Sequence, residues 1–145
     1  MHKKGFTLIE LLIVIAIIGI LSTLAVAALG SARVRMRDSQ RLADLGQFQN
    51  ALEIYYNQHS AYPLDTNVIL GSTNFACLSS VTGFGPSGCT EAILPQINPD
   101  IKAGFNYVYN GAKGSYAITA KLEGKAGDLS GAVQQTPNGL TKTTQ

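Results

Sequence analysis

Residues 11–29 form an unbroken run without a charged side chain, composed mainly of Leu, Ile, Val and Ala. Extended back to Phe6, the apolar stretch covers about 24 residues, which as an α-helix measures about 36 Å. A bilayer core is about 30 Å thick, so this segment is long enough to cross one. The rest of the chain is rich in Gly, Ser, Thr and Asn. It predicts one small domain of roughly 110 residues, enough for a modest core.

The charge and the residue inventory exclude several classes of function. The formal net charge is only +2, which gives no basic footprint for a nucleic-acid partner. The two histidines, His2 and His59, have no metal ligands or catalytic partners at a suitable spacing, and no phosphate-binding loop is present. The sequence therefore indicates a protein that is not an enzyme and needs no cofactor.

Three interpretations of the N-terminal segment are open, and they differ in where the chain would be cut. An ordinary signal peptide would use the small residues Ala25 to Ala27 and release a soluble binding module that begins at Ala28. The apolar run is longer than the usual 7–15 residues or so of a signal peptide, and the acid Glu10 at its front is unusual there. The second interpretation is an uncut membrane anchor, whose orientation the flanking basic residues do not decide.

The third interpretation accounts for the acid. The opening KKGFTLIELL, from Lys3 to Leu12, closely resembles the processing and assembly signature of type IV pilins and type II secretion pseudopilins. The resemblance implies that a prepilin peptidase cuts between Gly5 and Phe6 and methylates the new amine of Phe6. It implies an assembly role for Glu10, because a carboxylate in a membrane helix needs a partner. The Phe6 amine, in the same chain or in a neighbouring subunit, would be that partner.

The same resemblance implies a function. The chain would be a structural subunit of a type IV pilus-like filament or a type II secretion pseudopilus, polymerised through its N-terminal helix with copies of itself or with other pilins and pseudopilins. Before assembly it would lie in the cytoplasmic (inner) membrane as a single-pass protein with its head outside the cytoplasm. An inner-membrane assembly platform would then load it into a filament at the cell surface or in the periplasm. Pilus or pseudopilus, and major or minor subunit, stay open at this point.

The helix is expected to continue past the apolar run. Apolar side chains recur there every three or four residues, at Leu42, Leu45, Phe48, Leu52, Tyr55 and Tyr56. This amphipathic stripe, with no proline before Pro63, predicts a nearly continuous helix over 6–58. Arg33, Arg37 and Arg41 recur every four residues on one face of it. They predict either a solvated face relieved by Asp38 and Asp44, or contacts with lipid headgroups or with acids of neighbouring subunits.

Residues 64–100 predict a long loop, with one short helical turn over 91–95. Cys77 and Cys89 lie in this loop without a histidine near enough for a zinc site. In an exported protein such a pair favours a disulfide, whereas a reducing compartment would leave two thiols. Alternating side chains over 105–122 predict a β-hairpin.

The tyrosine-rich face of that hairpin has two interpretations. Phe105, Tyr107 and Tyr109 would either cover the apolar stripe of the helix or form the recognition surface of a secreted binding module. A third strand is expected near 129–135, followed by a loose tail from Thr136. Major pseudopilins often hold calcium in this region.

Asp128 and Glu123 are weak calcium candidates, since such a site needs about six to eight oxygen ligands. Overall the sequence predicts a pilin-like α+β fold, in which a long N-terminal α-helix packs against a small antiparallel β-sheet. The expected segments are a leader at 1–5, a transmembrane and assembly helix at 6–29, its amphipathic continuation at 30–62, a disulfide-containing loop region at 63–104, and a sheet with a flexible tail at 105–145.

Overall fold

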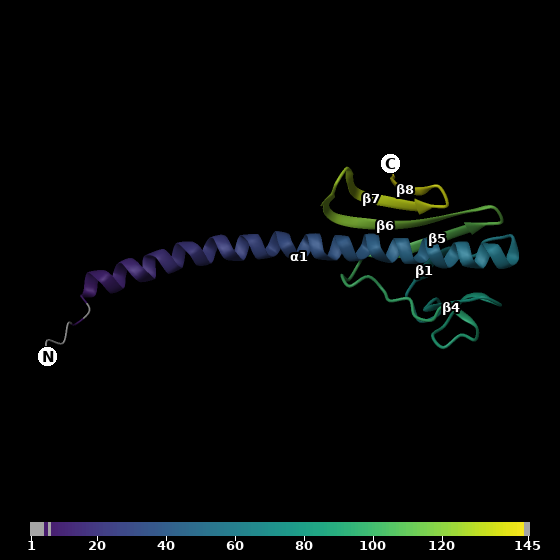
Figure 1. Cartoon of the computed structure of the whole chain (residues 1–145), viewed down its shortest axis with the longest axis horizontal. Helices are drawn as coiled ribbons and strands as arrows, with labels where there is room; N and C mark the ends of the chain where they lie inside the picture. Colours follow the sequence, from purple (N-terminus) through teal and green to yellow (C-terminus); the bar gives the residue numbers. More distant parts are fainter. Residues whose placement is uncertain (1–4, 6, 144–145) are drawn as a thin grey trace. The chain divides into compact units, whose positions relative to one another are not determined.

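The computed structural model describes residues 5 and 7–143 of the 145-residue chain. It divides into two compact units, Met1–Val34 and Arg35–Gln145, the second of which we call the head. One helix, α1 (Leu8–His59), contributes to both units, and all eight strands follow it in the head (Figure 1). The α+β prediction is confirmed, and the observed helix agrees closely with the expected range.

In the first unit, every described side chain from Leu8 to Arg33 is exposed. The most apolar 18-residue window of α1 has a mean hydropathy of 2.9, which makes the helix long and apolar enough to cross a membrane. The hydroxyl of Ser22 donates to the Ile18 carbonyl oxygen at 2.7 Å, and that of Thr23 donates to the Ile20 carbonyl oxygen at 2.7 Å. These polar side chains therefore use local hydrogen bonds and suit an apolar environment.

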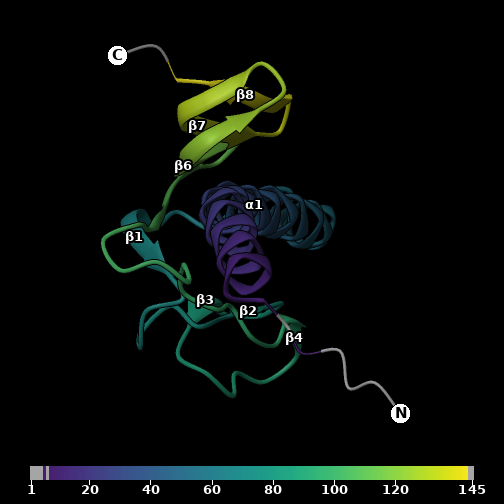
Figure 2. The same ribbon diagram turned by 90° about the vertical axis from the view of Figure 1, so that its left-hand side faces the viewer.

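The head contains two antiparallel sheets, and Figure 2 shows β6, β7 and β8 at the top of the view and β2, β3 and β4 in its lower half. The larger sheet has the strand order β1-β5-β6-β7-β8, and the smaller one has the order β3-β2-β4. The strands are β1 (Thr66–Leu70), β2 (Cys77–Ser79), β3 (Gly83–Gly85), β4 (Ala92–Leu94), β5 (Tyr107–Ala112), β6 (Ser115–Ala126), β7 (Leu129–Thr136) and β8 (Gly139–Lys142).

The predicted hairpin over 105–122 forms as β5 and β6. Its closing pair is Ala112 with Ser115, so Lys113 and Gly114 make a two-residue turn. The predicted third strand is also confirmed as β7, which pairs with β6.

Two expectations for the head are wrong. Residues 64–100 are not a plain loop, because they hold β1 to β4, and residues 92–94 form a strand instead of a helical turn. The strands β2, β3 and β4 have three residues each, too few to show an alternating pattern. The tail from Thr136 is not loose over its whole length either. It turns at Pro137 and Asn138, and β8 pairs with β7.

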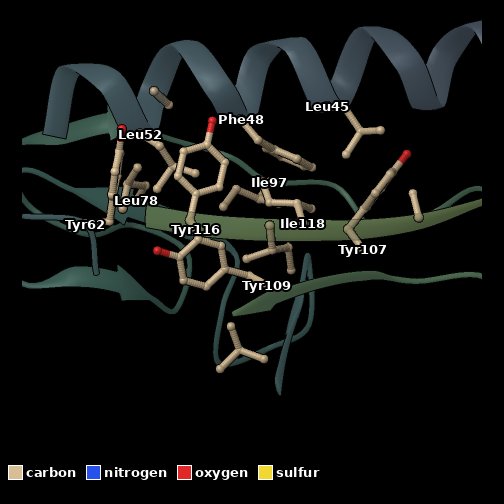
Figure 3. Packing of buried hydrophobic residues seen from close by; sticks show 14 of the residues in the cluster. Leu45, Phe48, Leu52, Tyr62, Leu78, Ile97, Tyr107, Tyr109, Tyr116 and Ile118 are labelled. Carbon is tan, nitrogen blue, oxygen red and sulfur yellow. The ribbon is translucent and has the colours of Figure 1, made fainter. Parts of the chain in front are cut away.

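The core lies between the helix and the larger sheet (Figure 3). Leu45, Phe48 and Leu52 point from α1 towards Tyr107 and Tyr109, as the sequence predicted. The rings of Phe48 and Tyr107 meet edge to face with centroids 5.3 Å apart, an arrangement that aromatic pairs prefer. The tyrosine line of the hairpin is therefore buried in the core, and it is not an exposed recognition face.

Candidate assembly site

The N-terminus of α1 is built around Thr7 and Glu10. The backbone N–H of Thr7 donates to Glu10 Oε2 at 2.8 Å, and the Thr7 hydroxyl donates to the same oxygen at 2.6 Å. In return, the Glu10 N–H donates to Thr7 Oγ1 at 3.4 Å. This reciprocal arrangement is a capping box, which satisfies backbone donors that the first helical turn leaves without partners.

The capping role of Thr7 could have been predicted from the sequence, because Thr-x-x-Glu before an apolar run is the pattern of a capping box. Glu10 is thus held at the start of the helix, where a negative charge also suits the helix dipole. Gly5 lies exposed outside α1. Phe6, the predicted site of cleavage and methylation, lies outside the described residues, as do residues 1–4 of the predicted leader.

On both sides of Glu10, the first unit presents an extensive apolar surface. The large side chains that are more than two-fifths exposed there are Leu8, Ile9, Leu11, Leu12, Ile13, Val14, Ile15, Ile17, Ile18, Ile20, Leu21, Leu24, Val26 and Leu29. An apolar surface of this kind marks a contact with lipid or with other protein. The first unit can therefore bury an apolar helix surface against lipid or protein, and this surface carries one carboxylate.

A second cluster of charged residues fastens α1 within the head. Its members, three cations and three acids, are Arg37, Asp38, Arg41, Asp100, Lys102 and Glu123. Arg41 is fully buried and lies at the centre. Its Nε is 2.6 Å from Asp100 Oδ2, and its Nη1 is 2.9 Å from Glu123 Oε1.

Glu123 receives cations from both sides. Arg37 donates to its two oxygens at 2.7 and 2.8 Å, and Lys102 Nζ lies 2.6 Å from Oε2. Hydrogen bonds from Arg37, then from Lys102, hold the pKa of Glu123 well below its usual range. Burial raises the pKa of Asp100, but hydrogen bonds from Arg41 and the Lys102 N–H outweigh it, so this pKa is also lowered. Both acids are therefore ionised at neutral pH.

Asp38 links this cluster to an irregularity in the sheet. The β6–β7 pairing shifts register between Lys121 and Lys125. Inside this interval, the N–H groups of Glu123 and Gly124 donate to the Asp38 carboxylate at 2.9 and 2.8 Å. A bulged segment leaves backbone groups without strand partners, and here a side chain of α1 accepts from two of them.

The expectation for the arginine line is wrong at two of its three positions. Arg37 and Arg41 are neither a solvated face nor free for lipid or neighbouring subunits, because acids of the same chain bind them. Asp38, which the solvated interpretation named, does bind Arg41 at 2.7 Å. Asp100 and Glu123 lie 59 to 86 residues further along the chain, so helical spacing alone carried no sign of them. Arg33 is exposed, as the solvated interpretation expected.

Comparison with known proteins agrees with the apolar N-terminal helix and its acid. Residues 1–26 match the model of the prokaryotic N-terminal methylation motif. Fimbrial protein EcpC of Eikenella corrodens is 32% identical over 130 residues, which are 87% of this chain and 77% of that protein. Type IV major pilin protein PilE of Neisseria gonorrhoeae is 42% identical over 83 residues, which are 56% of this chain and 46% of that protein.

The chain belongs to the type IV pilin and pseudopilin family.

A relative from the secretion branch of this family also matches. Type II secretion system core protein G of Aeromonas hydrophila is 34% identical over 62 residues, or 43% of each chain. The matched parts of PilE and of core protein G are thus less than half of those proteins. No solved structure matches the chain significantly.

The two weak calcium candidates, Glu123 and Asp128, lie in different surroundings. Both carboxylate oxygens of Glu123 are already bound by cations, and Asp128 is exposed in the turn between β6 and β7. Over residues 5 and 7–143, no group of three or more His, Cys, Asp or Glu side chains could hold a metal ion.

The two cysteines of the chain are joined. Cys77 in β2 and Cys89 after β3 form a disulfide with their Cα atoms 6.4 Å apart. The pairing agrees with the export interpretation, and it fastens the small sheet. The bond closes a short loop around β3, so it stabilises this sheet by restricting the unfolded chain.

Proposed function

We propose that this chain is a structural filament subunit. In this proposal a prepilin peptidase cuts between Gly5 and Phe6, methylates Phe6, and leaves a subunit that polymerises through its N-terminal helix. The observation that carries the proposal is the first unit, an exposed apolar helix with Glu10 as its one acid. The methylation motif that matches residues 1–26 supports the same processing.

The capping box suggests how Glu10 takes part in assembly. Both bonds from Thr7 end on Oε2, so within the described residues Oε1 is open to a further donor. In the proposed filament, the methylated amine of a neighbouring Phe6 reaches this oxygen. The pairing would compensate the carboxylate in apolar surroundings, where an uncompensated charge is costly. Correct register then follows, because only one stagger of neighbouring helices brings amine and acid together.

The apolar helix also supports a location. Before assembly, we propose, α1 crosses the cytoplasmic membrane once, with the head outside the cytoplasm. The partners are then the lipid bilayer, the peptidase that also methylates, an inner-membrane assembly platform, and other copies of this chain or related pilins. The finished filament lies at the cell surface or in the periplasm.

Between the two uses of the family, the extent of the matches favours a pilus. The similarity to fimbrial protein EcpC covers 87% of this chain, including most of the head. The similarity to core protein G covers 43%. We therefore propose a pilus subunit, with a secretion pseudopilus as the second candidate.

The deciding experiment compares the unchanged chain with Glu10→Gln in a host that has a prepilin peptidase and its assembly machinery. Glutamine keeps the hydrogen-bonding pattern of a capping box but removes the charge. The intact mass and N-terminal sequence of membrane-bound and sheared protein would be measured. Both chains should begin at Phe6 and be heavier by one methyl group, and Glu10→Gln should be almost absent from sheared filaments.

Glu91→Gln is the matched control, because Glu91 is an exposed acid of the head and its loss should leave assembly unchanged. A mature chain that begins at Ala28 would end the filament proposal and favour a secreted binding module. Filaments of Glu10→Gln at normal yield would show instead that the charge pairing is wrong, although the chain is a filament subunit.

A further inference from the structure

The head contains the dipeptide Asn-Gly twice, at residues 110–111 and 138–139. Asn-Gly is the sequence most prone to spontaneous deamidation, in which the backbone nitrogen of the second residue attacks the side-chain amide carbon of the asparagine. Glycine favours this attack because it has no side chain to hinder the approach and leaves the backbone free to turn. Since both copies share this local chemistry, the fold around each copy controls its reactivity.

The first copy lies in an inner strand. β5 pairs with β1 on one side and with β6 on the other. Asn110 Oδ1 accepts a hydrogen bond from the Asn67 N–H at 2.9 Å. The Gly111 N–H donates to the Asp65 carbonyl oxygen at 2.8 Å. The attacking nitrogen and the amide that it would attack are therefore both held in place, and a reaction there requires the strands to separate.

The second copy lies in the turn of an edge hairpin. Pro137 and Asn138 join β7 to β8, which begins at Gly139. β8 is four residues long and is the last strand of the larger sheet, at the top of Figure 2. Asn138 is exposed, and the described side-chain hydrogen bonds beside the turn, from Gln135 and Thr136, do not involve its amide. A short edge hairpin opens at a lower free energy than an inner strand, so this copy has the freedom and the water that the reaction needs.

We propose that Asn138 is a site of spontaneous deamidation and that the fold protects Asn110. The Gly139 backbone nitrogen loses its proton and attacks Asn138 Cγ, which closes a succinimide ring and releases ammonia. Water then adds to one of the two ring carbonyl carbons and opens the ring. Opening at the side-chain carbonyl gives aspartate. Opening at the backbone carbonyl gives isoaspartate, in which the chain continues through the former side chain. Water is the co-reactant, and no oxidant or reductant takes part.

Both products change the edge of the larger sheet. Each replaces a neutral amide with a carboxylate, and isoaspartate also adds a methylene group to the backbone of a two-residue turn. The length of such a turn sets the register of its hairpin. The longer backbone therefore disturbs the pairing of β8 with β7, which runs from Thr136–Gly139 to Val133–Lys142. The inner strands β5 and β6 lie beyond β7 and keep their pairing.

The test follows the purified full chain in micelles of an uncharged detergent during a long incubation at mildly alkaline pH. Trypsin cuts after lysine, so the peptide 126–142 reports on Asn138, its one asparagine, and the peptide 103–113 reports on Asn110. Mass spectrometry with fragmentation measures deamidation at each site, and chromatography separates aspartate from isoaspartate. Asn138 should react at least about tenfold faster than Asn110, because opening an inner strand costs more free energy than opening an edge turn. A mixture of aspartate and isoaspartate is expected, as ring opening requires.

Asn138→Gln is the matched control, because glutamine keeps an exposed amide at this position but closes a ring much less readily. Its peptide 126–142 should stay unmodified over the same period. Incubation of the unchanged chain in urea with the disulfide reduced should give similar rates at Asn110 and Asn138, because the fold then protects neither. Equal rates in the folded chain, an Asn138 that stays intact, or aspartate without isoaspartate would overturn the proposal. A rate difference that persists in urea would overturn it as well, since local sequence would then explain the contrast.

Discussion

The guanidinium of Arg41 and the carboxylate of Asp100 form two parallel hydrogen bonds, Nε to Oδ2 at 2.6 Å and Nη2 to Oδ1 at 2.8 Å. The residues are 59 positions apart, and their side chains are 0% and 2% exposed. This bidentate geometry is the favourable one for a buried ion pair. The pair joins α1 to the segment before β5, and removing one member leaves the other as a buried charge without its partner.

We therefore expect Arg41→Met to destabilise the head by about 3–5 kcal/mol, the range for breaking a buried ion pair from one side. Urea unfolding of the full chain in uncharged detergent, followed by the near-ultraviolet signal of the core tyrosines, measures the free energy. Arg35→Met removes an exposed arginine of the same helix and should change stability by less than about 0.5 kcal/mol. Equal losses of unfolding free energy in the two variants would show that the buried ion pair stabilises the head no more than an exposed arginine does.

The ion cluster also predicts how the head responds to acid. The pKa of Glu123 is lowered by hydrogen bonds from Arg37 and Lys102, and the pKa of Asp100 is lowered because bonds from Arg41 outweigh burial. Unfolded carboxyl groups titrate near pH 4. The stabilisation is therefore complete above about pH 5, and it is lost as the pH falls below about 4 towards the lowered folded pKa values.

Urea midpoints between pH 7 and pH 2 measure this dependence. Glu123→Gln should be less stable than the unchanged chain at pH 7, and its stability should fall less steeply below pH 4, because one titrating group with a lowered pKa is gone. Glu91→Gln, which alters an exposed acid, should keep the original slope. An unaltered slope in Glu123→Gln would contradict the assignment of the acid response to this cluster.

The Cys77–Cys89 disulfide should stabilise the small sheet more than the large one. Reduction of the unchanged chain should lower the free energy of unfolding by about 2–4 kcal/mol, since the bond restricts the unfolded chain. Amide exchange should rise mainly in β2, β3 and β4, with β5 to β7 less affected. Thiol labelling without reductant should fail at both cysteines, and ready labelling would mean that the disulfide is absent from the isolated protein.

Gly111 in β5 is expected to tolerate no side chain. A Cβ there would collide with the Pro63 carbonyl oxygen and the Tyr109 side chain, which are joined by a hydrogen bond of 2.8 Å from the Tyr109 hydroxyl. Gly111→Ala should therefore cost about 1–3 kcal/mol or more, as overpacking does. Gly114→Ala meets nothing within 4 Å and is the control for thermal unfolding. Equal midpoints for the two variants would contradict this crowding.

Several parts of the fold could be predicted because their signals are local. The apolar run, the stripe from Leu42 to Tyr56 and the alternation over 105–122 each repeat within a few residues, and they correspond to α1, β5 and β6. The three-residue strands of the small sheet and the four-residue β8 are too short for such a repeat. Their strand character comes from pairing with neighbours, so they were expected as loop and tail.

The sequence by itself determined an apolar helix that has no charge over residues 11–29 and one acid at its start. Helix length, hydrophobicity and the Thr7–Glu10 cap depend on neighbouring residues only. Only the tertiary structure decided which partners the other charged side chains have. Arg37 and Arg41 look like a solvated line until folding brings Asp100 and Glu123 beside them. The physical reason is that an ionic contact depends on distance in space, which spacing along the chain does not encode.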